Sequence, residues 1–143
     1  MHPLWRLTRG LTLGVRAIVV DEDRRVLLVE HTYVKGWHLP GGGIERGETA
    51  ADSAVRELEE EAAVAVETTP ELFGLYANFA NMDRDHIAVF LIRKWHFLDR
   101  SRPRLEIART GLFSLDALPE ATTNGTRRRL AELFDNQEKS PAW

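Results

Sequence analysis

Residues 41–64 read GGGIERGETAADSAVRELEEEAAV, a stretch that combines three glycines, a predicted helix and a cluster of carboxylates. Glu57, Glu60 and Glu61 occupy positions i, i+3 and i+4, which fall on one face of a helix. Like charges that lie so close repel one another in water, so we expect a cation to offset them. Divalent ions that prefer oxygen ligands are the obvious candidates.

The helix carries signals for its start and for its orientation. Thr49 is a good N-cap, and Asp52 three residues later predicts a capping box. The apolar positions that predict a face docked on a sheet are Ala51, Val55, Leu58 and Ala62. We expect the glutamates on another side, with Arg56 binding and orienting Glu60 one turn later. The alternative is a solvated, Glu-rich surface helix. The presence of Glu48 and three glycines at defined spacings from the glutamates disfavours that alternative.

The glycines predict a defined loop between a strand and the helix. Gly41, Gly42 and Gly43 lack a Cβ, so their main-chain carbonyls can approach a metal or a phosphate closely. Pro40 restricts the conformation at the entry to this loop. A flexible turn with no ligand is the alternative interpretation.

These residues resemble the signature of the Nudix hydrolase family: Gly, five residues, Glu, seven residues, then Arg-Glu-apolar-x-Glu-Glu-x-Gly-apolar. The matching positions in this chain are Gly42, Glu48, Arg56, Glu57, Leu58, Glu60, Glu61, Ala63 and Val64. Ala63 replaces the family's final glycine, which commonly ends the helix in a left-handed conformation that costs alanine roughly 1 kcal/mol or more. We therefore expect the helix to end differently or to run on slightly.

The resemblance implies an α/β protein with a mixed α+β sheet, a Nudix-type α/β/α sandwich, formed by residues 1–143 as one domain. It implies a metal-dependent hydrolase that cleaves a diphosphate linkage in a nucleoside diphosphate joined to another group, or in a nucleoside triphosphate, with Mg²⁺ or Mn²⁺ as cofactor. Such ions neutralise the phosphate oxygens and activate the attacking water. Their implied ligands are Glu57, Glu60, Glu61 and a carbonyl of Gly41 or Gly42, with Glu48 as a supporting or direct ligand and Arg56 as the residue that orients the carboxylates.

The resemblance also implies a further glutamate from a later loop, as a metal ligand or general base. We assign that role to Glu106, with an ordinary exposed glutamate as the alternative. Asp83 and Asp85 are second choices, because their loop could overhang the site.

Four residues form the predicted substrate-binding set. Trp37, Tyr33 and Phe79 could stack on a base, with core packing or exposure at the rim as the alternative for each. His86 opens a predicted strand and completes the set, although a packed or surface histidine is the favoured interpretation.

Patterns in the remaining chain predict strands and one further helix. Leu13–Val20, apolar apart from Arg16, and Val26–Val29 predict a hairpin around a polar turn. Other predicted elements are strands at Leu72–Ala77 and His86–Phe97, a short strand reaching Phe113, and a helix at about Gly125–Asn136.

Composition excludes several classes of protein. A net charge of −3 argues against a general binder of nucleic acid or membrane surfaces. The absence of cysteine excludes disulfides, thiolate zinc sites and cysteine nucleophiles. Three arginines interrupt the N-terminus, which therefore does not read as a secretion signal, and no run reaches the length of a membrane span. We expect a cytoplasmic protein with a small-molecule nucleotide substrate; both a monomer and a homodimer stay open.

A catalytically silent Nudix-like domain, used for ligand sensing or protein contact, is the alternative function. Such domains typically lose carboxylates of the signature, whereas this chain keeps Glu57, Glu60 and Glu61. The sequence does not identify the nucleoside diphosphate derivative, since substrate markers of related families do not align well with it.

Overall fold

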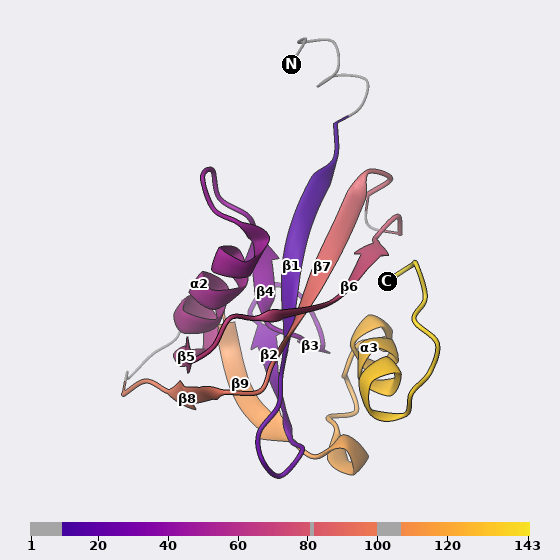
Figure 1. Ribbon diagram of the computed structural model, residues 1–143. Helices are drawn as coiled ribbons and strands as arrows, with labels where there is room; N and C mark the ends of the chain where they lie inside the picture. The colour runs from indigo at the N-terminus through magenta and orange to yellow at the C-terminus, as the bar shows by residue number, and fades with distance from the viewer. Residues whose placement is uncertain (1–9, 81, 100–106) are drawn as a thin grey trace.

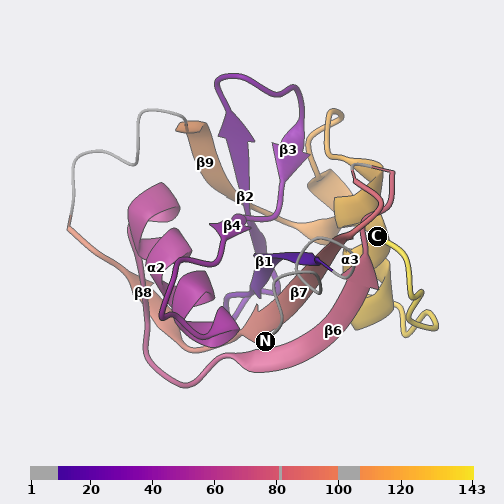
Figure 2. The same cartoon turned by 90° about the horizontal axis from the view of Figure 1, so that it is seen from above.

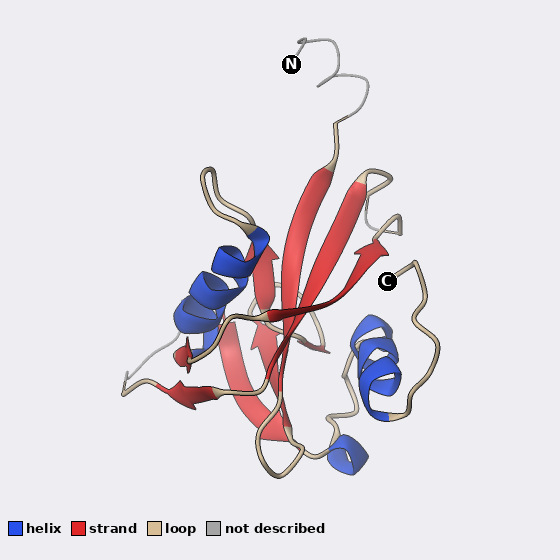
Figure 3. Cartoon of the chain, in the orientation of Figure 1, coloured by secondary structure: helices blue, strands red, loops and turns tan. Residues whose placement is uncertain are grey.

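The computed structural model describes residues 10–80, 82–99 and 107–143. Helix α2 (Ala50–Ala62) and helix α3 (Asn124–Phe134) lie on opposite sides of the strands, as Figure 1 and Figure 3 show from one side and Figure 2 shows from above. The predicted α/β/α sandwich is thereby confirmed. In the ranges that the structure describes, no helix has the length and apolarity to cross a bilayer. That residues 1–143 form one domain stays a prediction.

A four-stranded mixed sheet forms the centre of the fold. Its order is β4 (Gly41–Gly43), β1 (Thr12–Val19), β7 (Asp85–Ile92) and β6 (Glu71–Ala77). The β1–β7 pair is parallel, whereas β4 and β6 run antiparallel to their neighbours. This arrangement places the glycine strand at one edge of the sheet, directly beside β1.

Two smaller sheets complete the strands. One has the order β3 (Trp37–His38), β2 (Val26–His31) and β9 (Ile107–Phe113). The other pairs β5 (Val64–Val66) with β8 (Trp95–Phe97), and a 3-10 turn, η1 (Leu115–Ala117), precedes α3.

Two expectations about the strands are wrong. β1 and β2 do not form a hairpin ladder: they belong to different sheets, and the turn between them is closed by the isolated Val20–Val26 bridge and a hydrogen bond from Asp21 N to the Arg25 carbonyl. Both edges of β1 are already occupied, by β4 and β7, so β2 turns away to pair with β3 and β9. The strand expected at His86–Phe97 is divided into β7 and β8, with the charged pair Arg93 and Lys94 between them.

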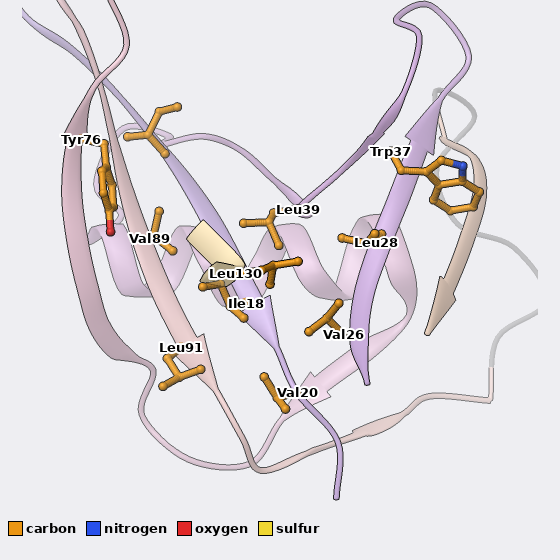
Figure 4. Close-up of a cluster of buried hydrophobic side chains, with 11 residues drawn as sticks. Ile18, Val20, Val26, Leu28, Trp37, Leu39, Tyr76, Val89, Leu91 and Leu130 are labelled. Carbon is orange, nitrogen blue, oxygen red and sulfur yellow. The ribbon is translucent and has the colours of Figure 1, made fainter. Parts of the chain in front are cut away.

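The core lies on both faces of the central sheet, because side chains alternate along each strand. Val15, Ala17 and Val19 of β1 pack toward α2, where Ala54, Leu58 and Ala62 are buried. The opposite face packs against the β2 sheet and α3, and Figure 4 shows Ile18, Val89 and Leu91 converging there with Leu28 and Leu130. The sheet therefore has one face committed to the acidic helix and one committed to a larger apolar cluster.

A buried ionic network attaches α3 to β6. The Arg129 side chain is 0% exposed, its Nε lies 2.9 Å from Glu132 Oε1, and its Nη2 donates to Glu132 Oε2 at 3.0 Å. The Tyr76 hydroxyl donates to Glu132 Oε1 at 2.7 Å, and the Arg129 guanidinium lies 3.9 Å above the Tyr76 ring. Because each charge in this network is buried with a partner, removal of one member leaves an uncompensated charge.

Candidate active site

The ends of α2 follow from its local sequence. The Thr49 side chain accepts from Asp52 N at 3.1 Å and Asp52 accepts from Thr49 N at 3.4 Å, which confirms the capping box. At the other end Ala63 adopts φ 53° and ψ 41°, the left-handed conformation. The expectation that the helix would avoid that geometry is wrong, and alanine carries the strain that glycine would not.

The carboxylates of α2 are not all on a solvent face. Glu57 and Glu61 are 5% and 2% exposed and share the buried side of the helix with Ser53, whereas the Glu60 side chain is 40% exposed. The predicted separation of packing face from acidic face is therefore wrong for Glu57 and Glu61. They lie one position from Leu58 and Ala62, which pack toward the sheet, and the adjacent glycine strand leaves room for them.

Glycine is needed where α2 meets β4. Gly41–Gly43 form an edge strand rather than the predicted loop, with Gly42 opposite Val15. A Cβ on Gly42 would come within 2.5 Å of Glu57 Oε1, and a Cβ on Gly41 would overlap the Val15 carbonyl oxygen. Gly41 N donates to Glu61 Oε1 at 3.1 Å. Gly41 and Gly42, whose carbonyls are predicted metal ligands, thus border the two buried carboxylates.

Arg56 connects the carboxylates of the signature to the glycine strand. Its two-pronged contact is with Glu48, from Nε to Oε2 at 2.8 Å and from Nη2 to Oε1 at 3.0 Å, and the predicted contact with Glu60 is also present. Nη1 donates to Glu57 Oε1 at 2.9 Å and to Glu60 Oε2 at 3.2 Å, and Nη2 also donates to the Gly43 carbonyl at 3.0 Å. One guanidinium therefore restrains three carboxylates and the edge strand together.

Glu48 acts as the anchor of this arrangement. Besides Arg56, its Oε1 accepts from Glu45 N and from Ser53 Oγ, each at 2.8 Å. The Arg56 guanidinium, followed by the Glu45 N–H, lowers the pKa of Glu48 to about 2. Glu48 is therefore ionised at any pH near neutrality and holds Arg56 in place.

Glu61 lies in the opposite electrostatic situation. Burial, followed by the neighbouring Glu57 carboxyl, raises the pKa of Glu61 to about 8, with the Arg16 charge acting the other way. Its Oε2 is buried and accepts no hydrogen bond from any residue that the structure describes. A buried polar oxygen without a partner is costly, and a divalent cation would supply the missing contact and displace the Glu61 proton. The oxygen-rich donor set at this position fits such an ion.

The three glutamates do not form a ready-made metal cluster. Within the described residues, no three His, Cys, Asp or Glu side chains are grouped closely enough to hold an ion. Arg56 donates hydrogen bonds to Glu57 and to Glu60 and thereby offsets their mutual repulsion. Convergence of Glu57, Glu60 and Glu61 on one ion therefore stays a prediction.

Two cavities border the glycine strand. One, of about 580 Å³, is lined by Gly43, Arg56, Glu57 and Glu60 among others. The second, of about 340 Å³, is lined by residues of β1, β4 and β7 that include Arg16. A cavity of about 600 Å³ around Asp21, Arg93 and Trp95 contains none of the predicted site residues.

The predicted substrate-binding residues lie in two separate places. Trp37 is 7% exposed and belongs to the core, edge-on to Phe113 at 5.0 Å, so little of its ring is available for stacking (Figure 4). Tyr33 is 70% exposed, in the β2–β3 connection. Phe79, 58% exposed, contacts His86 edge-on at 5.6 Å beyond the end of β6. Their roles in binding stay predictions.

The structure describes two of the three predicted base candidates, Asp83 and Asp85. Glu106 lies outside the described residues. Asp83 is exposed, and Asp85 accepts from Thr12 Oγ1 at 2.7 Å and from Asn78 Nδ2 at 2.9 Å. The sequence analysis assigned no role to Arg16. Arg16 is the only charged residue in the apolar run Leu13–Val20, and a lone charge in an apolar strand is a signal that could have marked it as a candidate site residue.

Comparison with known proteins gives consistent results. A family profile described as NUDIX domain matches residues 10–134. The chain is similar to a putative 8-oxo-dGTP diphosphatase of Bacillus subtilis (strain 168), 36% identical over 76 residues, which cover 53% of this chain and 50% of that protein. It is also similar to putative mutator protein MutT4 of Mycobacterium tuberculosis (strain CDC 1551 / Oshkosh), 32% identical over 128 residues, covering 85% and 47%. The chain spans about half the length of these curated relatives.

Solved structures extend the likeness to the whole fold. A MutT NUDIX hydrolase from Burkholderia pseudomallei superposes with a TM-score of 0.72 at 28% identity, covering 85% of this chain and 97% of that one. An ADP-ribose pyrophosphatase from Streptococcus suis 89-1591 superposes with a TM-score of 0.66 at 26% identity, covering 90% and 94%.

Proposed function

This chain belongs to the Nudix family, and we propose that it hydrolyses a diphosphate linkage in a nucleoside diphosphate derivative or a nucleoside triphosphate, with Mg²⁺ or Mn²⁺ as cofactor. The observation that carries the proposal is the pair Glu57 and Glu61, buried side by side against a glycine strand. Glu61 Oε2 has no hydrogen-bond donor within the described part of the chain. Burial of two neighbouring carboxyl groups without a cation lowers the stability of the fold. Their burial therefore suits a site that binds cations.

Each residue of the site has a defined task in this proposal. Glu57, Glu60 and Glu61 hold the divalent ions, with a carbonyl of Gly41 or Gly42. When bound, the ions neutralise phosphate oxygens and lower the pKa of water. Arg56 fixes the orientation of Glu57 and Glu60, and Glu48 holds Arg56. A general base is still required, and Glu106 stays our prediction for that role.

The substrate is a small nucleotide, and two classes are favoured. One curated relative is named a putative 8-oxo-dGTP diphosphatase, and one solved structure at 26% identity is named an ADP-ribose pyrophosphatase. A modified nucleoside triphosphate and a nucleoside diphosphate sugar are therefore the first candidates. The cytoplasmic location belongs to the same proposal, and the choice between monomer and homodimer stays open.

The test is a phosphate-release screen over nucleoside triphosphates, 8-oxo-dGTP, nucleotide sugars, dinucleoside polyphosphates and ADP-ribose, with Mg²⁺ and with Mn²⁺. Glu60→Gln removes a charge without a change of shape and should greatly reduce turnover on the best substrate. Glu59→Gln is the matched control, because Glu59 is an exposed neighbour on the same helix. Turnover of Glu60→Gln equal to that of Glu59→Gln would refute the metal assignment. Inactivity of the wild type on every substrate would favour a ligand-sensing domain.

A further inference from the structure

Arg16 is a cation with unused hydrogen-bonding capacity next to the candidate active site. Its side chain is partly buried in the middle of β1, and its one hydrogen bond to the described residues is from Nη1 to the Leu39 carbonyl at 2.9 Å. A guanidinium carries five N–H donors. Most of the donors of Arg16 therefore have no protein acceptor within the described residues.

The surroundings of Arg16 give these donors room for a ligand. Alternation along β1 places Arg16 on the face of Gly14 and Ile18, opposite the face that packs on α2. Gly14 has no side chain to fill the space beside it, and both residues line the cavity of about 340 Å³ together with Gly42 and Ile87. An unfilled volume thus lies between a positive side chain and the glycine strand.

The positive charge of Arg16 indicates that a ligand in this volume would present an anionic group to it. Burial lowers the pKa of Arg16, while the carboxylates of Glu61 and Glu57 raise it, and arginine stays protonated in either case. The Arg16 guanidinium hydrogen-bonds the Leu39 carbonyl, and its charge also interacts electrostatically with Glu61 and Glu57. Asp85 also lines the cavity, but Thr12 and Asn78 already donate to its carboxylate.

We propose that Arg16 is a substrate-positioning residue, whose free N–H donors hold an oxygen of the substrate's diphosphate group on the β1 side of the glycine strand. This inference rests on the proposed function, since it assumes a diphosphate substrate. The planar fork of a guanidinium matches two phosphate oxygens, and Arg16 would approach the anion from the face of β1 opposite α2. Arg16 would thereby fix the orientation of the diphosphate relative to α2.

The competing role is structural, in which Arg16 only balances the buried glutamates and bonds the Leu39 carbonyl. The two roles predict different kinetics for Arg16→Gln at saturating metal. Loss of a charge-assisted contact to phosphate should raise KM about 10-fold or more. Loss of charge balance alone should instead change the metal concentration that gives half the maximal rate, or lower the unfolding midpoint.

The experiment compares Arg16→Gln, Arg16→Lys and Arg25→Gln with the wild type on the best substrate. Arg25 is the matched control, because it pairs with Asp21 at 2.7 Å and lines a different cavity. We expect a raised KM with little change in metal requirement for Arg16→Gln, partial recovery for Arg16→Lys, and wild-type values for Arg25→Gln. If Arg16→Gln does not fold, Arg16→Lys carries the test, since it keeps the charge and loses the fork.

A binding measurement separates this inference from the proposed function. Inorganic pyrophosphate with Mg²⁺ should raise the unfolding midpoint of the wild type and of Arg25→Gln, and should raise that of Arg16→Gln much less. An active wild type with an unchanged KM in Arg16→Gln would overturn only the role of Arg16. The role of Arg16 would also be overturned if pyrophosphate raised the unfolding midpoint equally in all variants, or if it did not raise the midpoint of the wild type. An inactive wild type would overturn the proposed function first.

Discussion

Replacement of Ala63 by glycine should stabilise the protein, because Ala63 ends α2 with φ 53° and ψ 41°. The left-handed conformation costs alanine about 1–2 kcal/mol, whereas glycine adopts it without a steric penalty. The greater entropy that glycine loses on folding offsets about 0.5–1 kcal/mol of this difference. The net gain should therefore be about 0.5–1 kcal/mol.

Thermal unfolding measures this gain directly. With about 2 cal/mol/K of unfolding entropy per residue, a chain of this length should show a rise in Tm of about 2–3 °C. Ala62→Gly is the matched control one residue earlier, at the last residue of the helix and 6% exposed; it removes a buried methyl group without relief of a positive φ, so it should lower the stability by roughly 1 kcal/mol. An Ala63→Gly variant no more stable than the wild type would refute the assigned strain.

Three further predictions follow from contacts in the structure. Arg56→Lys loses the two-pronged contact with Glu48 and should lower turnover by a similar factor for two unrelated substrates; a loss confined to one substrate would mean that Arg56 binds the ligand. Arg129→Met leaves Glu132 buried without its partner and should cost about 3–5 kcal/mol in urea unfolding; a loss below about 1 kcal/mol would contradict that reasoning. Glu61 holds its proton to higher pH in the folded protein than in the unfolded chain, so in EDTA the stability should fall as the pH rises from 4.5 to about 8. Thermal melts of Glu61→Gln should lack that fall, and identical pH profiles for the two proteins would disprove the raised pKa.

The sequence was sufficient for α2 because its signals are local. The capping box at Thr49 and Asp52 needs only residues three positions apart, and the structure contains both of its hydrogen bonds. Helix α3 was likewise expected from its apolar stripe, within two residues at either end. Periodicity and capping depend on neighbours in the chain, so a single sequence carries them.

Burial of the glutamates could not be predicted from those signals. Helical spacing places Glu57 and Glu61 near one another, but it does not show that a strand of three glycines packs against them. Nor does spacing show that Glu48, eight residues from Arg56, is its closest partner instead of Glu60. These contacts depend on the path of the chain between β4 and α2.

Strand pairing was predicted least well, for a related reason. An apolar run such as Leu13–Val20 identifies a strand but not its neighbours, and a short polar turn suggested a hairpin that does not form. Arg16 was visible as a lone charge in that run. Only the sheet shows that its side chain borders a cavity beside the glycine strand.

The most direct test of the proposed function is the position of Mn²⁺ in crystals of the protein soaked with that ion, located by its anomalous scattering. We predict a peak within coordination distance, about 2.0–2.3 Å, of carboxylate oxygens from at least two of Glu57, Glu60 and Glu61. The same soak of Glu57→Gln should show a much weaker peak. If a catalytically active protein gave Mn²⁺ peaks only away from all three carboxylates, the assignment of this site would be contradicted.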